Sequence, residues 1–306
     1  MKHRIALAQI YPRLGDLEWN FELFRQNIQE AVREKAQLIV FPELGLTGYF
    51  LRDMVSSAAL KKNSRLLREF LQLSKKISIS LGFVEETDSV EFFNAGAYIE
   101  KGEILHIHHK VYLPTYGMFD EQRYFSRGKS IRSFKTQFGK LGMLICEDLW
   151  HPTSIQIAIQ DGAKIILALS SSPGRGVGPN EKLYSSKMWE EMNRFYAGLY
   201  GIYYVFVNRA GVEDGINFWG GSEVISPKGE VIAKGPYFEE ALLIAELDEG
   251  EIRRSRVTSP ILRDENLDLV LYELQRIREE SSGNQSKPRG RDARSFPKRR
   301  GQKGRV

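Results

Sequence analysis

Residues 141–152 read LGMLICEDLWHP. The apolar run 141–145 predicts a buried strand that leads directly into Cys146, and Pro152 favours the start of a helix soon afterwards. A strand-to-helix turn exposes the side chain at its apex, and the backbone N–H groups of such a turn can bind the oxyanion of a tetrahedral intermediate. Cys146 is therefore a candidate nucleophile. A free cysteine is also often just a small apolar residue of the core, and this segment alone leaves both interpretations open.

Strand-like and helix-like segments alternate on both sides of this stretch. This alternation is typical of helices and sheets packed in layers, and we expect an α/β or α+β sandwich. Periodicity predicts helices over about 21–32, 57–76, 153–160, 181–199 and 264–280. It predicts strands over 4–10, 37–41, 79–84, 92–99, 104–109, 131–134, 141–145, 164–169, 203–207, 224–226, 231–233 and 241–245.

The composition indicates one folded domain followed by a basic tail. The chain has 306 residues, of which 42% are hydrophobic, enough for one large core. The polar segment 281–306 contains nine Lys or Arg and one Asp, and it cannot bury enough apolar surface to fold alone. We expect a domain over 1–280 and a disordered tail over 281–306. The chain's net charge is +5, so residues 1–280 carry −3 and the basic excess belongs to the tail.

The cysteine content and the N-terminus predict a cytoplasmic protein. One cysteine cannot form an internal disulfide, which fits a reducing compartment. The apolar stretch near the N-terminus is interrupted by Gln9 and predicts a first strand, not a signal peptide. No apolar run approaches the roughly 18 to 20 residues of a membrane-spanning helix.

Three further charged residues are candidates for catalysis. Glu43 directly follows a predicted buried strand, where a partly desolvated carboxylate can act as a general base. Lys110 follows the strand 104–109; its ammonium could lower a thiol pKa and stabilise negative charge on an intermediate. Glu121 lies among aromatic residues. It is interpreted either as a second acid that positions the substrate or as one partner of a structural ion pair. Taken singly, Glu43 and Lys110 would more often be solvated surface residues.

Together these segments resemble the nitrilase superfamily of carbon–nitrogen hydrolases. The matching motifs are F-P-E-x-x-x-x-G-Y around Glu43, H-K-x-x-L-P around Lys110 and G-x-x-I-C-E-D-x-W around Cys146, and the resemblance covers about residues 4–247. It implies a four-layer αββα sandwich that forms homodimers or larger homo-oligomers, and a mechanism without a metal or other cofactor. Cys146 would be the nucleophile and Glu43 the general base, while Lys110 and the Glu147 N–H would stabilise the oxyanion and Glu121 would assist the attacking water.

The segments LPTYGMFDEQRYF, ICEDLW and LALSSSPGRG are similar to the glutaminase portion of glutamine-dependent NAD synthetases. This similarity implies that a small amide is the substrate, with a glutamine-like ω-amide among the candidates. It also implies a substrate pocket in which Glu147 pairs with an α-ammonium group. The implied pocket residues are Tyr49, Tyr116, Glu147, Trp150 and Ser172.

Other activities stay open. Residues 207–230 resemble stand-alone amidases and carbamoyl hydrolases, and no Ser-Gly-Gly-x-Asp nucleotide loop is present, so the resemblance supports amide hydrolysis without extending to NAD synthesis. An N-carbamoyl hydrolase, a nitrilase and an ammonia-supplying subunit of a separate synthetase are the alternatives. A different class is nucleic-acid binding through the basic tail, which is disfavoured because Phe296 is its one aromatic residue.

Two smaller groups of polar residues have structural interpretations. His106 and His108 share one face of a predicted strand, but no set of carboxylate and Cys ligands lies near them in the sequence to complete a metal site. We therefore expect no metal and interpret them as polar strand residues. Asn208, Glu213 and Asp214 are expected to shape a loop near the pocket or a contact between subunits.

Overall fold

The computed structural model describes residues 1–176 and 183–281. By its internal contacts the chain divides into two units, Met1–Leu262 and Arg263–Val306. Of the predicted tail, 281–306, only Ser281 is among the described residues. The domain boundary at residue 280 therefore stays a prediction.

The first unit contains two six-stranded sheets and a β-hairpin. The first sheet has the order β14 (Ala241–Asp248), β1 (Lys2–Gln9), β2 (Leu38–Val40), β3 (Ser78–Glu86), β4 (Phe92–Glu100) and β5 (Glu103–His109). The second has the order β13 (Val231–Lys234), β12 (Glu223–Ile225), β9 (Tyr203–Asn208), β8 (Ile165–Ser170), β7 (Gly139–Ile145) and β6 (Ser133–Thr136). The hairpin pairs β10 (Ala210–Glu213) with β11 (Ile216–Trp219).

Parallel strands form the middle of each sheet and bring their carboxyl ends to one edge. In the first sheet β1, β2 and β3 are parallel, and in the second β7, β8 and β9 are parallel. The chain leaves β2 just before Glu43, β7 just before Cys146 and β8 just before Ser171. The candidate residues therefore follow the ends of strands, where loop side chains of an α/β sheet commonly form a site.

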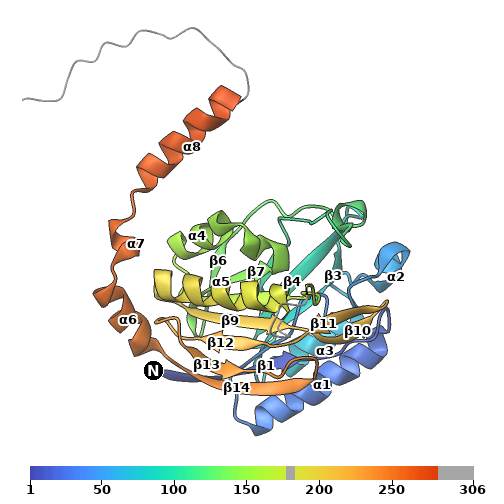
Figure 1. The fold of residues 1–306 in the computed structure, drawn as a ribbon. Coiled ribbons are helices and arrows are strands. Elements are labelled where there is room, and N and C mark those ends of the chain that lie inside the picture. The colour runs from blue at the N-terminus through green and yellow to red at the C-terminus, as the bar shows by residue number, and fades with distance from the viewer. Residues whose placement is uncertain (177–182, 282–306) are drawn as a thin grey trace, which may run out of the picture. The chain divides into compact units, whose positions relative to one another are not determined.

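Alternate residues of the central strands enter different cores, which gives the molecule its layers. Ile5 and Leu7 of β1 pack between the two sheets, together with Leu167 of β8. Ala6 of β1 faces the other way, toward the helices α1 (Leu17–Arg33) and α3 (Arg65–Leu73), while Ile166 of β8 faces α4 (Pro152–Gln160) and α5 (Tyr184–Tyr200). Figure 1 shows α1 and the pair α4 and α5 on opposite sides of the sheets. The predicted αββα sandwich is confirmed.

The predicted helix over 57–76 is wrong, because two short helices replace it. After a 3-10 turn, η1 (Arg52–Met54), come α2 (Val55–Ala58) and, seven residues later, α3. Leu60 is buried between them and forms a bridge to Glu85 of β3. Ser64 then caps the new helix by accepting a hydrogen bond from the Leu67 N–H. The apolar spacing across 60–71 reflects two elements packed on the same core.

The other differences lie toward the C-terminus. The loop expected around 208–214 is largely the hairpin β10–β11, with Glu213 at the end of β10. The helix expected over 181–199 is described from Tyr184 onward, and positions 181–182 lie outside the described residues. A helix α6 (Glu249–Thr258) was not predicted, and the short α7 (Ile261–Asp264) precedes α8 (Leu267–Ser281), which matches the helix expected over 264–280. Among the described helices, none has the length and apolarity to cross a bilayer.

Candidate active site

Cys146 lies at a strained turn between β7 and the 3-10 helix η3 (Cys146–Trp150). Its backbone φ is 45°, in the left-handed region that non-glycine residues rarely adopt. Such strain persists only where the surrounding structure imposes it, and it is frequent at functional sites. The turn leaves Cys146 partly exposed, whereas Ile145 before it is fully buried. The predicted strand, turn and helix around this cysteine are all present.

The thiol of Cys146 is held in its neutral form. Burial raises its pKa well above the usual range and Glu43 raises it further, while Lys110 lowers it by a smaller amount. Lys110 thus lowers the thiol pKa as the sequence suggests, but burial and Glu43 outweigh this contribution. Because a thiol is a poor nucleophile, chemistry at Cys146 requires a base that removes its proton.

Glu43, Lys110 and Glu121 form a row of buried charges. The Lys110 Nζ lies 2.7 Å from Glu43 Oε1 and 2.6 Å from Glu121 Oε1, and all three side chains are buried. Burial alone would lower the pKa of Lys110, but Glu121 and Glu43 together hold it well above its usual value. Burial raises the pKa of Glu121 to about 7, although Lys110 opposes the shift. Lys110 therefore stays charged, and Glu121 titrates close to neutral pH.

Two adjacent serines connect this row to the thiol. The Ser170 hydroxyl donates a hydrogen bond to Cys146 Sγ, with Oγ 3.6 Å from the sulfur. The next residue, Ser171, donates its backbone N–H to Glu43 Oε2 at 2.8 Å, and its hydroxyl donates to the Glu43 carbonyl. The end of β8 thus holds the carboxylate of the first sheet beside the cysteine of the second.

The Glu43 carboxylate is fixed on every side. Asn94 of β4 donates its amide N–H to Oε1 at 2.8 Å, in addition to the Lys110 and Ser171 contacts. Gly82 of β3 lies so close to this loop that a Cβ there would be 2.4 Å from the Pro42 carbonyl oxygen and 2.8 Å from the Glu43 Cα. A buried carboxylate with this many donors is preorganised, not a solvated loop acid.

A buried aspartate ties the Lys110 segment to the Cys146 turn. Asp148 Oδ1 accepts the backbone N–H groups of Val111 and Tyr112 at 2.9 and 3.0 Å. Its Oδ2 contacts the Ile145 N–H at 3.1 Å and the His108 ring at 2.8 Å. The two segments, far apart in the sequence, are thereby held in register.

Cys146 opens into a cavity of about 250 Å³, and five of its twelve lining residues are aromatic. Four of the five predicted pocket residues line it: Tyr116, Glu147, Trp150 and Ser172. The Tyr116 hydroxyl donates to Glu147 Oε2 at 2.9 Å, and the Ser172 Oγ accepts from Trp189 Nε1 at 2.8 Å. Arg175 lines the same cavity, so a cation and the Glu147 carboxylate lie in one pocket with the thiol.

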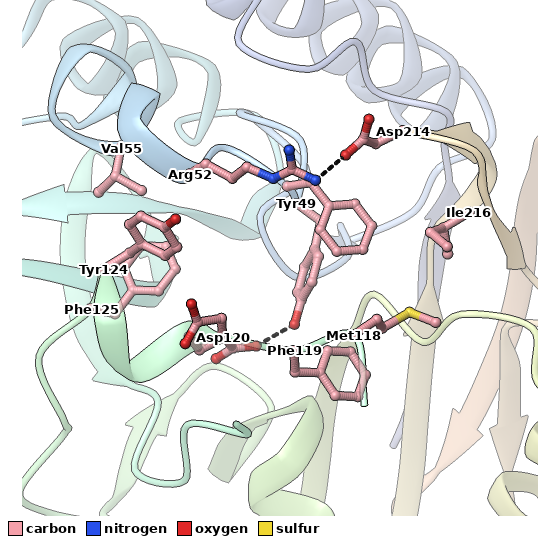
Figure 2. Close-up of a pocket in the computed structure, with 12 residues that line it drawn as sticks. Tyr49, Arg52, Val55, Met118, Phe119, Asp120, Tyr124, Phe125, Asp214 and Ile216 are labelled. Atoms are coloured by element: carbon pink, nitrogen blue, oxygen red, sulfur yellow. Dashed lines mark hydrogen bonds and ion pairs between the residues drawn. The ribbon is translucent and has the colours of Figure 1, made fainter. Parts of the chain in front are cut away.

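Tyr49, the fifth predicted pocket residue, lies in a second cavity of about 370 Å³. Its hydroxyl donates a hydrogen bond to Glu121 Oε1. Figure 2 shows Tyr49 with a dashed line at this hydroxyl. Arg52 and Asp214 form an ion pair at the rim of this cavity. Phe119 lines both cavities. Tyr49 contacts the row of buried charges through its hydrogen bond to Glu121, and it does not line the cavity of the thiol.

The sequence model of carbon–nitrogen hydrolases matches residues 4–257. The chain belongs to this family. The glutamine-dependent NAD(+) synthetase of Thermotoga maritima is 33% identical over 289 residues, covering 91% of this chain and 48% of that protein. The N-carbamoylputrescine amidase of Arabidopsis thaliana is 27% identical, covering 83% and 89%. The crystal structure of a carbon–nitrogen hydrolase from Helicobacter pylori G27 matches with a TM-score of 0.80 and 25% identity, covering 90% and 99%.

These similarities confirm the predicted nitrilase-type fold and the membership of the carbon–nitrogen hydrolases. The chain spans about half the length of the NAD synthetases that it matches. It spans most of the length of the N-carbamoylputrescine amidase.

Several polar residues of this candidate site were not singled out from the sequence. Asn94 has a detectable signal, because it is a polar residue inside an otherwise apolar strand. Ser170 and Ser171 lie in a serine run at the end of a buried strand. Asp148 belongs to the Cys146 motif, but its partners are distant in the sequence. Arg175 follows the same serine run, and its position in the cavity carried no signal beyond that proximity.

The remaining polar residues that the sequence singled out have structural contacts. His108 is paired with Asp148, whereas His106 stacks on Phe134. In the part of the chain that the structure describes, no three His, Cys, Asp or Glu side chains gather as metal ligands would. Asn208 Oδ1 accepts a hydrogen bond from the Ser172 N–H at 2.8 Å, and Glu213 Oε1 accepts one from the Tyr49 N–H at 2.8 Å. Both side chains therefore hold the backbone of residues that line the two cavities.

Proposed function

We propose that this chain hydrolyses the carbon–nitrogen bond of a small amide, with Cys146 as the nucleophile. One observation carries the proposal: the carboxylate of Glu43, already hydrogen-bonded to Lys110, is held beside the neutral thiol through Ser170 and Ser171. A base, a cation and a thiol in one buried site are the groups that acyl transfer through a thioester requires.

In the proposed first half-reaction, the Cys146 sulfur attacks the amide carbon while Glu43 accepts the thiol proton. The oxyanion that forms is stabilised by the Lys110 ammonium and by the backbone N–H of Glu147 at the strained turn. Glu43 then gives the proton to the amide nitrogen, the carbon–nitrogen bond breaks, and ammonia or an amine leaves. The acyl group remains on Cys146 as a thioester.

In the second half-reaction, water attacks the thioester carbon and Glu43 accepts a proton from that water. The thiolate leaves and regains the proton, so that the acid product and the starting enzyme are restored. Glu121 would hold Lys110 in place throughout and assist in orienting the water. The raised pKa of the thiol makes the thiolate a strong base when it leaves, so its prompt reprotonation by Glu43 is part of the mechanism.

The substrate is proposed to be an ω-amide such as glutamine. Support comes from the name of the relative from Thermotoga maritima, a glutamine-dependent synthetase, and from the Glu147 carboxylate in the cavity of the thiol. An N-carbamoyl compound is the second candidate, because the chain spans most of an N-carbamoylputrescine amidase. We further propose that the protein is cytoplasmic, which the single cysteine supports. We also propose that it forms a homo-oligomer, which the family resemblance supports and sedimentation of the purified protein can test.

The test is ammonia release from a panel of ω-amides, N-carbamoyl compounds and nitriles, run beside Cys146→Ala. We expect turnover of at least one amide by the wild type and none by the variant. Turnover that survives in a folded Cys146→Ala variant would exclude the thiol mechanism. A preference for N-carbamoyl compounds over ω-amides would select the second candidate.

A further inference from the structure

The cavity of Cys146 is lined by two oppositely charged side chains, and the ion pairs of the described residues do not join them. Glu147 and Arg175 both line it. The Glu147 carboxylate is hydrogen-bonded to the Tyr116 hydroxyl. The Arg175 Nη2 is buried, and it has no hydrogen-bond partner among the described residues. A buried guanidinium nitrogen without a partner is costly in a folded protein, and it needs an explanation such as a ligand.

The Arg175 side chain is held in place by stacking and close packing. Its guanidinium carbon lies 4.5 Å from the centre of the Phe119 ring and 5.9 Å from that of Tyr116. Gly117 approaches the same group so closely that a Cβ there would be 3.2 Å from Nη2. Stacking on aromatic faces leaves the edge of a guanidinium, where its N–H groups are, available to a ligand.

The backbone of Arg175 is fastened as well. Its N–H donates to the Ser185 Oγ at 3.0 Å, and its carbonyl accepts the Ser185 N–H at 3.2 Å. Ser185 lies in the first turn of α5, which packs on the second sheet. The guanidinium is therefore positioned by a regular element of the fold, as a binding residue for a small ligand needs to be.

The ligand that fits these groups carries both charges. An arginine fork binds a carboxylate through two parallel N–H···O bonds, and a glutamate accepts hydrogen bonds from an ammonium. An α-amino acid presents both groups on one carbon, and its side-chain amide would extend toward Cys146. An N-carbamoylamine without a carboxylate would leave Arg175 unpaired, so it matches the cavity less well.

We propose that Arg175 binds the α-carboxylate of the substrate and, with Glu147 on the α-ammonium, selects the ω-amide of a free α-amino acid such as L-glutamine. This inference rests on the proposed amide hydrolysis at Cys146 and adds to it a residue that determines specificity. Arg175 takes no part in the bond-breaking steps.

The experiment compares four amides that differ only in their charges. L-glutamine has both groups, glutaramate keeps the carboxylate, 4-aminobutanamide keeps the ammonium, and butanamide has neither. We expect Arg175→Gln to lower kcat/KM about 10- to 100-fold for L-glutamine and glutaramate, from the loss of a charge-assisted pair. For the other two amides it should stay within about 3-fold of the wild type. Glu147→Gln should instead penalise L-glutamine and 4-aminobutanamide.

The matched control is Arg123→Gln, at an exposed arginine outside the cavity, which should leave all four amides unaffected. An equal loss on all four amides with Arg175→Gln would show a structural role and overturn the inference. Unchanged kcat/KM for L-glutamine would overturn it too.

A binding measurement separates this inference from the proposed function. Calorimetric titration of Cys146→Ala with L-glutamine should give a Kd that rises about 10- to 100-fold when Arg175→Gln is added, and that does not change with Arg123→Gln. Binding that depends on Arg175 without any Cys146-dependent turnover would sink the proposed hydrolysis and keep the carboxylate site. Turnover of L-glutamine together with a Kd that does not change in Arg175→Gln would overturn the carboxylate site and keep the proposed hydrolysis.

Discussion

The buried carboxylate of Asp148 contacts the His108 ring, with Oδ2 2.8 Å from Nε2. The same carboxylate accepts backbone N–H groups from both sides of the site, at Val111 next to Lys110 and at Ile145 next to Cys146. One side chain therefore sets the spacing between the proposed nucleophile and the proposed oxyanion-stabilising cation.

Asp148→Asn should weaken both the fold and the site. The amide NH2 would replace one accepting oxygen, so that a donor faces a buried backbone N–H. Such an unsatisfied group costs about 1–3 kcal/mol, and we expect a loss of that size in the free energy of unfolding measured with urea. A small displacement of Lys110 should also lower kcat about 10-fold or more. The exposed Asp88→Asn is the control; equal stabilities for the two variants would contradict this role of Asp148.

Glu43→Gln should abolish most of the activity while keeping the fold. A glutamine retains an oxygen for Lys110 and Asn94 but cannot accept the thiol proton. Because burial raises the thiol pKa, little thiolate should form at neutral pH without a base that accepts the proton. We expect kcat/KM to fall about 10²- to 10⁴-fold, and alkylation of Cys146 by iodoacetamide to slow in parallel. A folded variant with activity within 3-fold of the wild type would mean that another group is the base.

The three residues proposed for catalysis could be predicted from the sequence because each follows a predicted strand within a recognisable motif. Cys146 and Lys110 directly follow β7 and β5, and Glu43 lies three residues after the end of β2. The apolar runs before these residues predict buried strands, and parallel strands bring their carboxyl ends to one edge of a sheet.

The remaining contacts depend on register and packing, which the sequence pattern does not determine. Asn94 reaches Glu43 only because β4 pairs beside β3 in one particular register. Tyr49 was assigned to the substrate pocket by similarity, yet its hydroxyl is bonded to Glu121 in the other cavity. The unpartnered guanidinium of Arg175 is visible only once side chains are placed.

Tyr49→Phe should move the acidic limb of the pH–activity profile to higher pH. The hydrogen bond from the Tyr49 hydroxyl lowers the pKa of Glu121, so its loss lets that pKa rise further. If ionised Glu121 is needed to hold Lys110 and orient water, activity at pH 6 should fall more than activity at pH 8. Tyr124→Phe removes a tyrosine hydroxyl from the same cavity without touching the Glu121 carboxylate, and it should leave the profile in place. Identical pH–activity profiles for the wild type and Tyr49→Phe would show that the acidic limb does not reflect the ionisation of Glu121.

Glu121→Gln should change how stability depends on pH. The pKa of Glu121 is about 7 in the folded protein, against an ordinary value of 4.5. Between these values the folded state binds a proton that the unfolded chain has lost. The stability that this group contributes is therefore complete below pH 4.5 and disappears as the pH rises through 7.

Relative to Glu121→Gln, which does not titrate, the wild type should lose on the order of 3 kcal/mol of unfolding free energy between pH 4.5 and pH 7. Above about pH 8 the difference should be constant. Urea unfolding of both proteins at half-unit pH steps measures it, with Glu103→Gln at an exposed position of β5 as the control that should show no such window. If the difference in unfolding free energy between the wild type and Glu121→Gln stays constant from pH 4.5 to pH 8, then Lys110 keeps Glu121 ionised over this whole range. The Glu121 carboxylate would then be a permanent counter-ion and not a group that titrates near neutral pH.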